Sequence, residues 1–72
     1  MKKVKEHGRF IGFEIDGMYI TLNVDYISRV IKVEKPEHYY IVLHDGGSIN
    51  IDNKVYVEIQ AILLGKNKSL ME

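Results

Sequence analysis

Three histidines, His7, His38 and His44, are the residues of this chain best suited to metal binding or acid–base chemistry. No two of them have the spacing that places ligands on one helix face, and no group of acidic residues completes a metal site. His38 and His44 fall on the same side of one predicted strand, but the rise of a strand separates them by roughly 20 Å. The histidines are therefore expected to be solvent-facing polar residues, and we expect neither a metal ion nor another cofactor.

Other catalytic patterns are equally weak. No serine lies in a nucleophile motif, and the carboxylates Glu14 and Asp16 flank a predicted turn without pointing to a pocket. Asp45-Gly46-Gly47 contains two glycines, but a phosphate-binding loop needs a longer glycine pattern that opens onto a helix. These observations predict a protein that is not an enzyme.

Aromatic and basic residues could supply a different chemistry. Tyr19 and Tyr26, with Arg29, Lys32 and Lys35 near them in sequence, could stack on bases or on a nucleotide ring. Against this, ten basic residues balance ten acidic ones, no RNA-binding motif is present, and tyrosine is common in strands and at protein interfaces. A small-ligand site stays an alternative, and nucleic-acid binding is the least favoured one.

Size and composition bound the fold that positions these side chains. The 72 residues predict a single domain, and 46% of them are hydrophobic, as is typical of folded proteins. The chain has no cysteine, no signal-peptide core and no run of about 20 apolar residues, so we expect a cytoplasmic protein without a membrane span. A core this small typically supplies only ~3–5 kcal/mol, which favours a homo-oligomer.

The first predicted hairpin has the clearest pattern. Apolar residues alternate over 9–15 and 18–22, and Asp16-Gly17 between them is typical of a type I′ turn. Such a turn pairs Ile15 with Met18, Phe13 with Ile20, and Ile11 with Leu22. All six of these side chains are apolar and lie on one face of this hairpin.

The middle of the chain is less regular. Residues 23–25 favour a turn or a single helical turn. A third strand is predicted over 26–33, where a bulge near Arg29 or Val30 would reconcile the uneven alternation. Pro36, which cannot donate to a strand ladder, marks a polar connection to the next strand.

Residues 39–51 predict a second hairpin, with Asp45-Gly46-Gly47 as its loop. The three-residue loop places Leu43 opposite Ile49 and Ile41 opposite Ile51, and gives one apolar face of Tyr39, Ile41, Leu43, Ile49 and Ile51. A loop of Gly46-Gly47 alone would place Leu43 opposite Asn50 and mismatch the two faces.

The other face of this hairpin is the predicted interaction face, because apolar residues interrupt a surface that would otherwise be polar. We expect another element or another subunit to cover part of it. Its residues are His38, Tyr40, Val42, His44 and Asn50.

The C-terminal part predicts a helix over 54–64, capped by Asp52 or Asn53 and stopped by Gly65. Val55, Val57 and Ile59 also alternate as in a strand, but the apolar run 59–64 breaks that alternation and favours the helix. The fold class is therefore α+β: one small antiparallel sheet of about five strands, built from two hairpins, with one C-terminal helix. Residues 1–8 are expected to be a loose basic arm, 9–64 the folded core, and 65–72 a polar tail.

The chain resembles the small FlbD-type flagellar protein family over residues 10–64. The matching features are the Asp16-Gly17 turn, Leu22-Asn23 followed by Ile27, then Pro36, Leu43-His44-Asp45-Gly46, and Glu58 early in the last helix. The family tends to have Asn-Gly at the first turn and Pro-Asp-Thr where this chain has Pro36-Glu37-His38. The resemblance implies a cytoplasmic accessory protein that acts by protein contact, without catalytic residues. Asp25-Tyr26-Ile27 gives a weaker similarity to LytTR-type DNA-binding domains, whose Arg-x-His-Arg-type motif is missing here.

Three functions remain open at this point. The first is a non-enzymatic interaction module, a small homo-oligomer that binds a protein partner through the Tyr40/Val42 face or the strand edges. The second is a phage-type or regulatory module that binds a small ligand such as a nucleotide, or inhibits an enzyme. The third is a nucleic-acid binder. Salt-dependent affinity would favour the third function, and saturable stabilisation by a small molecule would favour the second.

Overall fold

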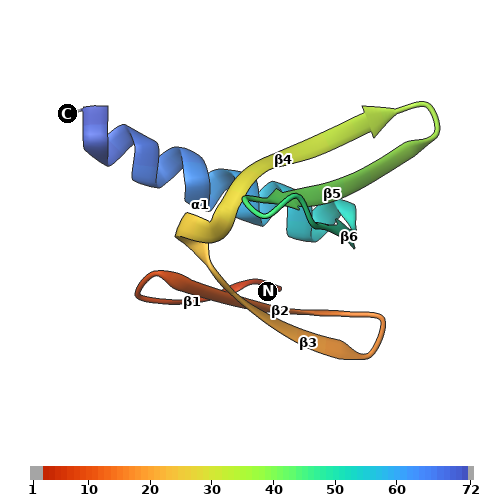
Figure 1. Ribbon diagram of the computed structural model, residues 1–72, viewed down its shortest axis with the longest axis horizontal. Helices are drawn as coiled ribbons and strands as arrows, with labels where there is room; N and C mark the ends of the chain where they lie inside the picture. The colour runs from red at the N-terminus through yellow and green to blue at the C-terminus, as the bar shows by residue number, and fades with distance from the viewer. Residues whose placement is uncertain (1–2, 72) are drawn as a thin grey trace.

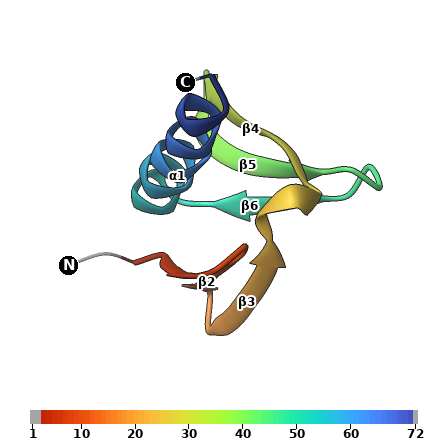
Figure 2. The ribbon, with the colours of Figure 1, turned by 90° about the vertical axis from the view of Figure 1, so that its left-hand side faces the viewer.

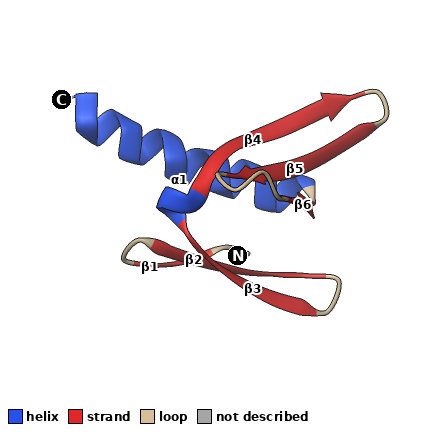
Figure 3. Cartoon of the chain, in the orientation of Figure 1, coloured by secondary structure: helices blue, strands red, loops and turns tan. Residues whose placement is uncertain are grey.

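The computed structural model describes residues 3–71, with side chains for residues 3–65. Figures 1 and 3 show its strands and helices in chain order. The elements are β1 (Lys5–His7), β2 (Phe10–Ile15), β3 (Met18–Asn23), the 3₁₀ helix η1 (Val24–Tyr26), β4 (Ile27–Glu34), β5 (Glu37–Leu43), β6 (Ser48–Ile51) and α1 (Asn53–Met71). They form an α+β fold with a C-terminal helix, as the sequence predicts.

The prediction of a single five-stranded sheet is wrong. The described strands form two three-stranded antiparallel sheets, a first sheet of order β1-β2-β3 and a second of order β4-β5-β6. The break lies at η1, where the Asn23 side-chain oxygen accepts a hydrogen bond from the Asp25 backbone N–H at 2.8 Å. The Val24 N–H also donates to the carbonyl of Arg9 at 2.7 Å. These bonds turn the chain out of the first sheet, so β4 starts a new one.

The first sheet confirms the predicted turn and register. Ile15 pairs with Met18, Phe13 with Ile20, and Ile11 with Leu22. Asp16 and Gly17 have φ values of 50° and 80°, the left-handed pair that a type I′ turn requires.

Residues 5–7, which the sequence places in a loose arm, instead form β1 and pair with β2. Two long-range contacts hold this segment. The Val4 side chain is only 3% exposed, and the Glu58 carboxylate on α1 accepts hydrogen bonds from the backbone N–H groups of Lys3 and Val4 at 2.9 Å. Because the partner residue lies at the far end of the chain, local sequence patterns carry no signal for this strand.

The second sheet confirms the predicted bulge, since the β4–β5 register shifts between Ile27 and Arg29. This shift turns Val30 to the side of Ile41, its partner on β5. Figure 2 shows α1 lying against one face of this sheet, with the first sheet below β6. We call the face toward α1 the inner face and the opposite face the outer face.

The predicted β5–β6 register is wrong by two residues. Ile41 pairs with Ile49, and Tyr39 pairs with Ile51. The loop is shifted along the chain: the Leu43 N–H donates to the Gly47 carbonyl at 2.8 Å, so the turn closes around residues 44–46, one residue earlier on each side than predicted. A shift of two residues preserves the alternation of a strand, so the predicted apolar and mixed faces are retained.

Helix α1 begins as predicted, with the Asp52 carboxylate accepting a hydrogen bond from the Val55 N–H at 2.8 Å. It does not stop at Gly65 but continues to Met71, so the predicted polar tail is helical in its described part. A glycine in a helix interior costs about 1 kcal/mol relative to alanine, which weakens the helix without ending it.

The core lies between the first sheet, the inner face of the second sheet and α1. Its most deeply buried side chains come from all three parts and are Phe13, Ile11, Ile41, Ile59 and Val55. No helix within the described residues is long and apolar enough to cross a membrane.

Candidate interaction surface

The outer face of the second sheet is the candidate functional surface. The strand register places eight side chains on it: Arg29, Ile31, Val33, His38, Tyr40, Val42, Ser48 and Asn50. Across the strands, Ile31 lies beside Tyr40, and Tyr40 beside Asn50. The outer face is therefore a continuous surface over all three strands.

The centre of this surface is apolar. Ile31, Val33, Tyr40 and Val42 are half-buried because they shield one another. None of the four belongs to the side chains that pack against the hydrophobic core. They form an apolar group that no element in the described part of the chain covers, which is the feature expected of a contact surface.

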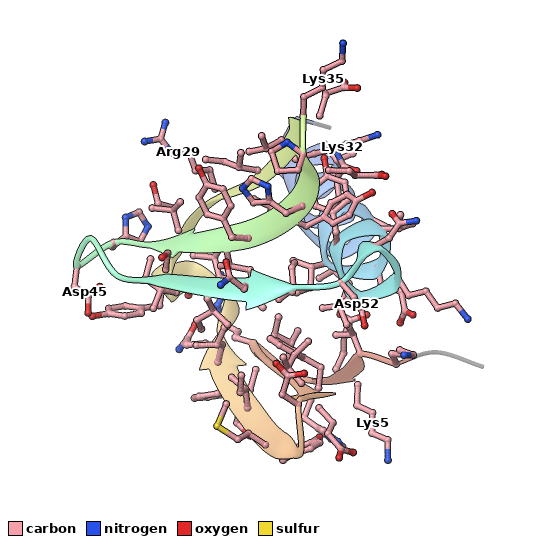
Figure 4. The ribbon with its side chains drawn as sticks, turned by 90° about the vertical axis from the view of Figure 1, so that its right-hand side faces the viewer. Lys5, Arg29, Lys32, Lys35, Asp45 and Asp52 are labelled. Carbon is pink, nitrogen blue, oxygen red and sulfur yellow. The ribbon has the colours of Figure 1, made fainter. Side chains whose placement is uncertain are left out.

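Polar groups stand at both ends of the apolar centre. At one end the His38 ring stacks on Tyr40, with ring centroids 5.9 Å apart and an angle of 15° between the planes. His38 Nδ1 donates to the Pro36 carbonyl at 2.8 Å, which holds the ring in this orientation. At the other end lies Arg29, the cross-strand neighbour of Val42, and Figure 4 shows it projecting away from the helix.

Four of the five residues predicted for the interaction face, His38, Tyr40, Val42 and Asn50, lie together on this surface. The fifth, His44, lies beyond the end of β5 in the loop to β6, and its N–H donates to the Tyr26 carbonyl at 3.0 Å. The sequence pattern missed Arg29, Ile31 and Val33, because the bulge before them reverses the faces of β4.

The residues predicted for ligand or nucleic-acid contact are not brought together. Tyr19 lies on the first sheet, over Gly12, where its hydroxyl would be 2.3 Å from any added Cβ. Lys32 points to the helix side of the second sheet, and Lys35 lies at the tip of the β4–β5 hairpin (Figure 4). Of this set, only Arg29 belongs to the outer face.

Tyr26, the remaining member of that set, makes a hydrogen bond within the fold. Its hydroxyl donates to the Asp45 carboxylate at 3.0 Å, which raises the pKa of Tyr26. The pKa of Asp45 is lowered, first by the hydrogen bond from the Gly47 N–H and then by Tyr26. This contact ties η1 to the β5–β6 loop.

A pocket of about 580 Å³ lies between the β2–β3 turn and the junction of β6 with α1, and Glu14 and Asp16, which the sequence did not connect with a pocket, help to line it. Residues 14–17 and 50–52 line it, together with Lys3, whose ammonium lies 3.7 Å from the Asp52 carboxylate. Carboxylates outnumber the single amine, so the pocket does not favour phosphates or nucleotides. No group of three or more potential metal ligands occurs among the described residues.

Comparisons with known proteins do not assign a function to this surface. No protein-family model, no curated protein and no solved structure matches the chain. The functional argument therefore depends on the chain's own residues.

Proposed function

We propose that this protein is a non-enzymatic interaction module whose outer face binds other protein molecules. The observation that carries the proposal is the uncovered apolar centre formed by Ile31, Val33, Tyr40 and Val42. Apolar side chains on a sheet normally gain about 25 cal/mol for each Å² removed from water. A partner that covers this centre would therefore remove apolar surface from water, and this burial would contribute favourable free energy to binding.

The area of the outer face limits how much surface a partner can bury there. The outer face is about 26 Å long, because β4 has eight residues, and three adjacent strands make it roughly 14 Å wide. A stable interface typically buries about 800 Å² on each partner. The contact would therefore extend past the apolar centre to the free edge of β4, or remain transient.

A homo-oligomer and a complex with another protein both use such a surface. The chain's resemblance to FlbD-type proteins supports an accessory role at the flagellum of its host. In that setting, deleting the gene would reduce swimming, and the wild-type chain would restore it. Restoration by a chain with an altered outer face would show that this role does not need the outer face, and normal swimming of the deletion strain would argue against the flagellar setting.

The test of the proposed surface is the double substitution Tyr40→Glu with Val42→Glu. Light scattering on the purified protein reports self-association, and pull-down from host lysate reports association with other proteins. Met18→Glu is the matched control, because Met18 is a 60% exposed apolar residue on the first sheet.

We expect the double variant to lose the wild-type association while circular dichroism shows an unchanged fold and Met18→Glu behaves as wild type. The proposal is wrong if all associations survive in the double variant. It is also wrong if the wild-type chain associates with neither itself nor another protein.

A further inference from the structure

We propose that the occupant of the outer face is an acidic amphipathic helix of a partner protein. Its aliphatic stripe would cover Ile31 and Tyr40, and its carboxylates would face Arg29 at one end and His38 at the other. This inference rests on the proposed function and adds the chemistry of the partner.

Charge segregation within the second sheet is the first argument. The chain has as many acidic as basic residues, yet none of the eight outward positions on β4, β5 and β6 carries a carboxylate. The two glutamates of these strands, Glu34 and Glu37, pair with each other on the inner side. Glu37 there accepts a hydrogen bond from the Tyr39 hydroxyl. The outer face therefore carries only cationic and neutral groups, which complement an acidic partner.

The shape of the face is the second argument. The same sheet already accommodates a helix on its inner face, where Val55 and Ile59 of α1 are fully buried. β5 has seven residues, or about 24 Å of strand, which matches about 16 residues of helix. An aliphatic stripe on a second helix would thus meet a surface of the same length.

The register also sets the spacing of the partner's charges. His38 lies beside Val33, four positions along β4 from Arg29, which is about 13 Å at the rise of a strand. Among residues on one face of a helix, those seven or eight positions apart come nearest to this distance, at about 10–12 Å along the axis. The partner's carboxylates should therefore be about two turns apart, one near each end of the aliphatic stripe.

Other occupants fit less well. In a symmetric pair, the same surface faces its own copy, so Arg29 would meet a face without carboxylates. Nucleic acid requires several cations along its backbone, whereas the outer face carries a single arginine and no lysine.

The experiment is a selection from a displayed library of single helices with randomised surface positions. The wild-type chain is the target, and the Tyr40→Glu with Val42→Glu variant is the counter-target. We expect the selected helices to carry an aliphatic stripe flanked by Asp or Glu at the stated spacing.

Two charge reversals then test the contact. Arg29→Glu should weaken binding of a selected helix about tenfold, because it places like charges together. Lys35→Glu makes the same charge change at the hairpin tip, outside the outer face (Figure 4), and should change affinity less than about twofold. A helix with its carboxylates exchanged for lysines should prefer the Arg29→Glu chain.

Three outcomes would overturn this inference. Selected helices that are basic or uncharged but still need Tyr40 and Val42 would refute the acidic partner and leave the proposed function intact. Equal effects of Arg29→Glu and Lys35→Glu on affinity would also refute the acidic partner and leave the proposed function intact. Recovery of no helix that distinguishes the target from the counter-target would refute the inference, and the pull-down described above would then decide the proposed function separately.

Discussion

The two faces of the second sheet come from the same strands but differ in whether other elements cover them. On β5, Tyr39 and Ile41 face inward and are almost fully buried, while Tyr40 and Val42 alternate with them and are half-buried. Aromatic and β-branched residues therefore occur on both faces. The difference arises because α1 and the first sheet cover one face only (Figure 2).

This contrast separates stability from recognition. Inner-face residues contribute to the core, so their loss should unfold the protein. Outer-face residues are not covered by α1, and the proposed partner would account for their apolar character. Substitutions at adjacent positions of β5 can test that separation directly.

The largest effect is expected from truncating Ile41, which is fully buried. Ile41→Ala removes buried methylene groups and leaves a cavity, which typically costs 2–5 kcal/mol, or about the whole stability of a domain of this size. Ile41→Val should cost only about 0.5–1.5 kcal/mol. Val42→Ala on the outer face is the matched control and should cost less than about 1 kcal/mol. Urea denaturation measures all three, and equal losses for Ile41→Ala and Val42→Ala would contradict the contrast.

The sequence predicted this contrast only in part. Alternation identified the faces of β5 and β6, because the period of two survives a register shift of two residues. It also located the first turn, the bulge and the start of α1. These features depend on neighbours within a few residues, which is why local patterns reveal them.

The features that the sequence did not reveal depend on distant partners. Lys3 and Val4 are held by Glu58, and no local pattern near residue 4 indicates that bond. The division into two sheets depends on how η1 redirects the chain. The membership of Ile31 and Val33 in the outer face depends on which side of Arg29 the bulge falls.

A second prediction compares two neighbouring tyrosines on opposite faces. The Tyr39 hydroxyl donates to Glu37, and this bond, followed by the burial of the side chain, raises the pKa of Tyr39 to about 12. The folded protein therefore holds this proton more tightly than the unfolded chain, whose tyrosines titrate near pH 10. The resulting stability is complete below about pH 10 and is lost as the pH rises toward 12.

Denaturant unfolding at several pH values measures this loss. Tyr39→Phe should flatten the dependence between about pH 10 and 12. Tyr40→Phe, on the outer face, should leave it as steep as in wild type. An unchanged slope in Tyr39→Phe would show that the inner tyrosine is not the group responsible.

A third prediction concerns the segment that α1 holds against the first sheet. Glu58→Ala removes the carboxylate that accepts the N–H groups of Lys3 and Val4. We expect a loss of about 1–3 kcal/mol, because hydrogen bonds to a charged group are lost and one donor is partly buried. Hydrogen exchange should accelerate over residues 3–7 before it does on β5. Glu14→Ala, at an exposed position of β2, is the control, and an equal effect there would refute the role of Glu58.

The smallest effect is expected from Gly65→Ala, which tests whether α1 influences only the face of the sheet that it covers. Gly65 lies inside α1, and a Cβ added there would meet no atom within 4 Å. Gly65→Ala should therefore stabilise the protein by about 0.5–1 kcal/mol, through better helix propensity and a less flexible unfolded chain. Gly17→Ala is the contrasting control, because Gly17 has a φ of 80° and should lose stability. If Gly65→Ala also changed binding at the outer face, the two faces would be coupled through the sheet and would not act independently.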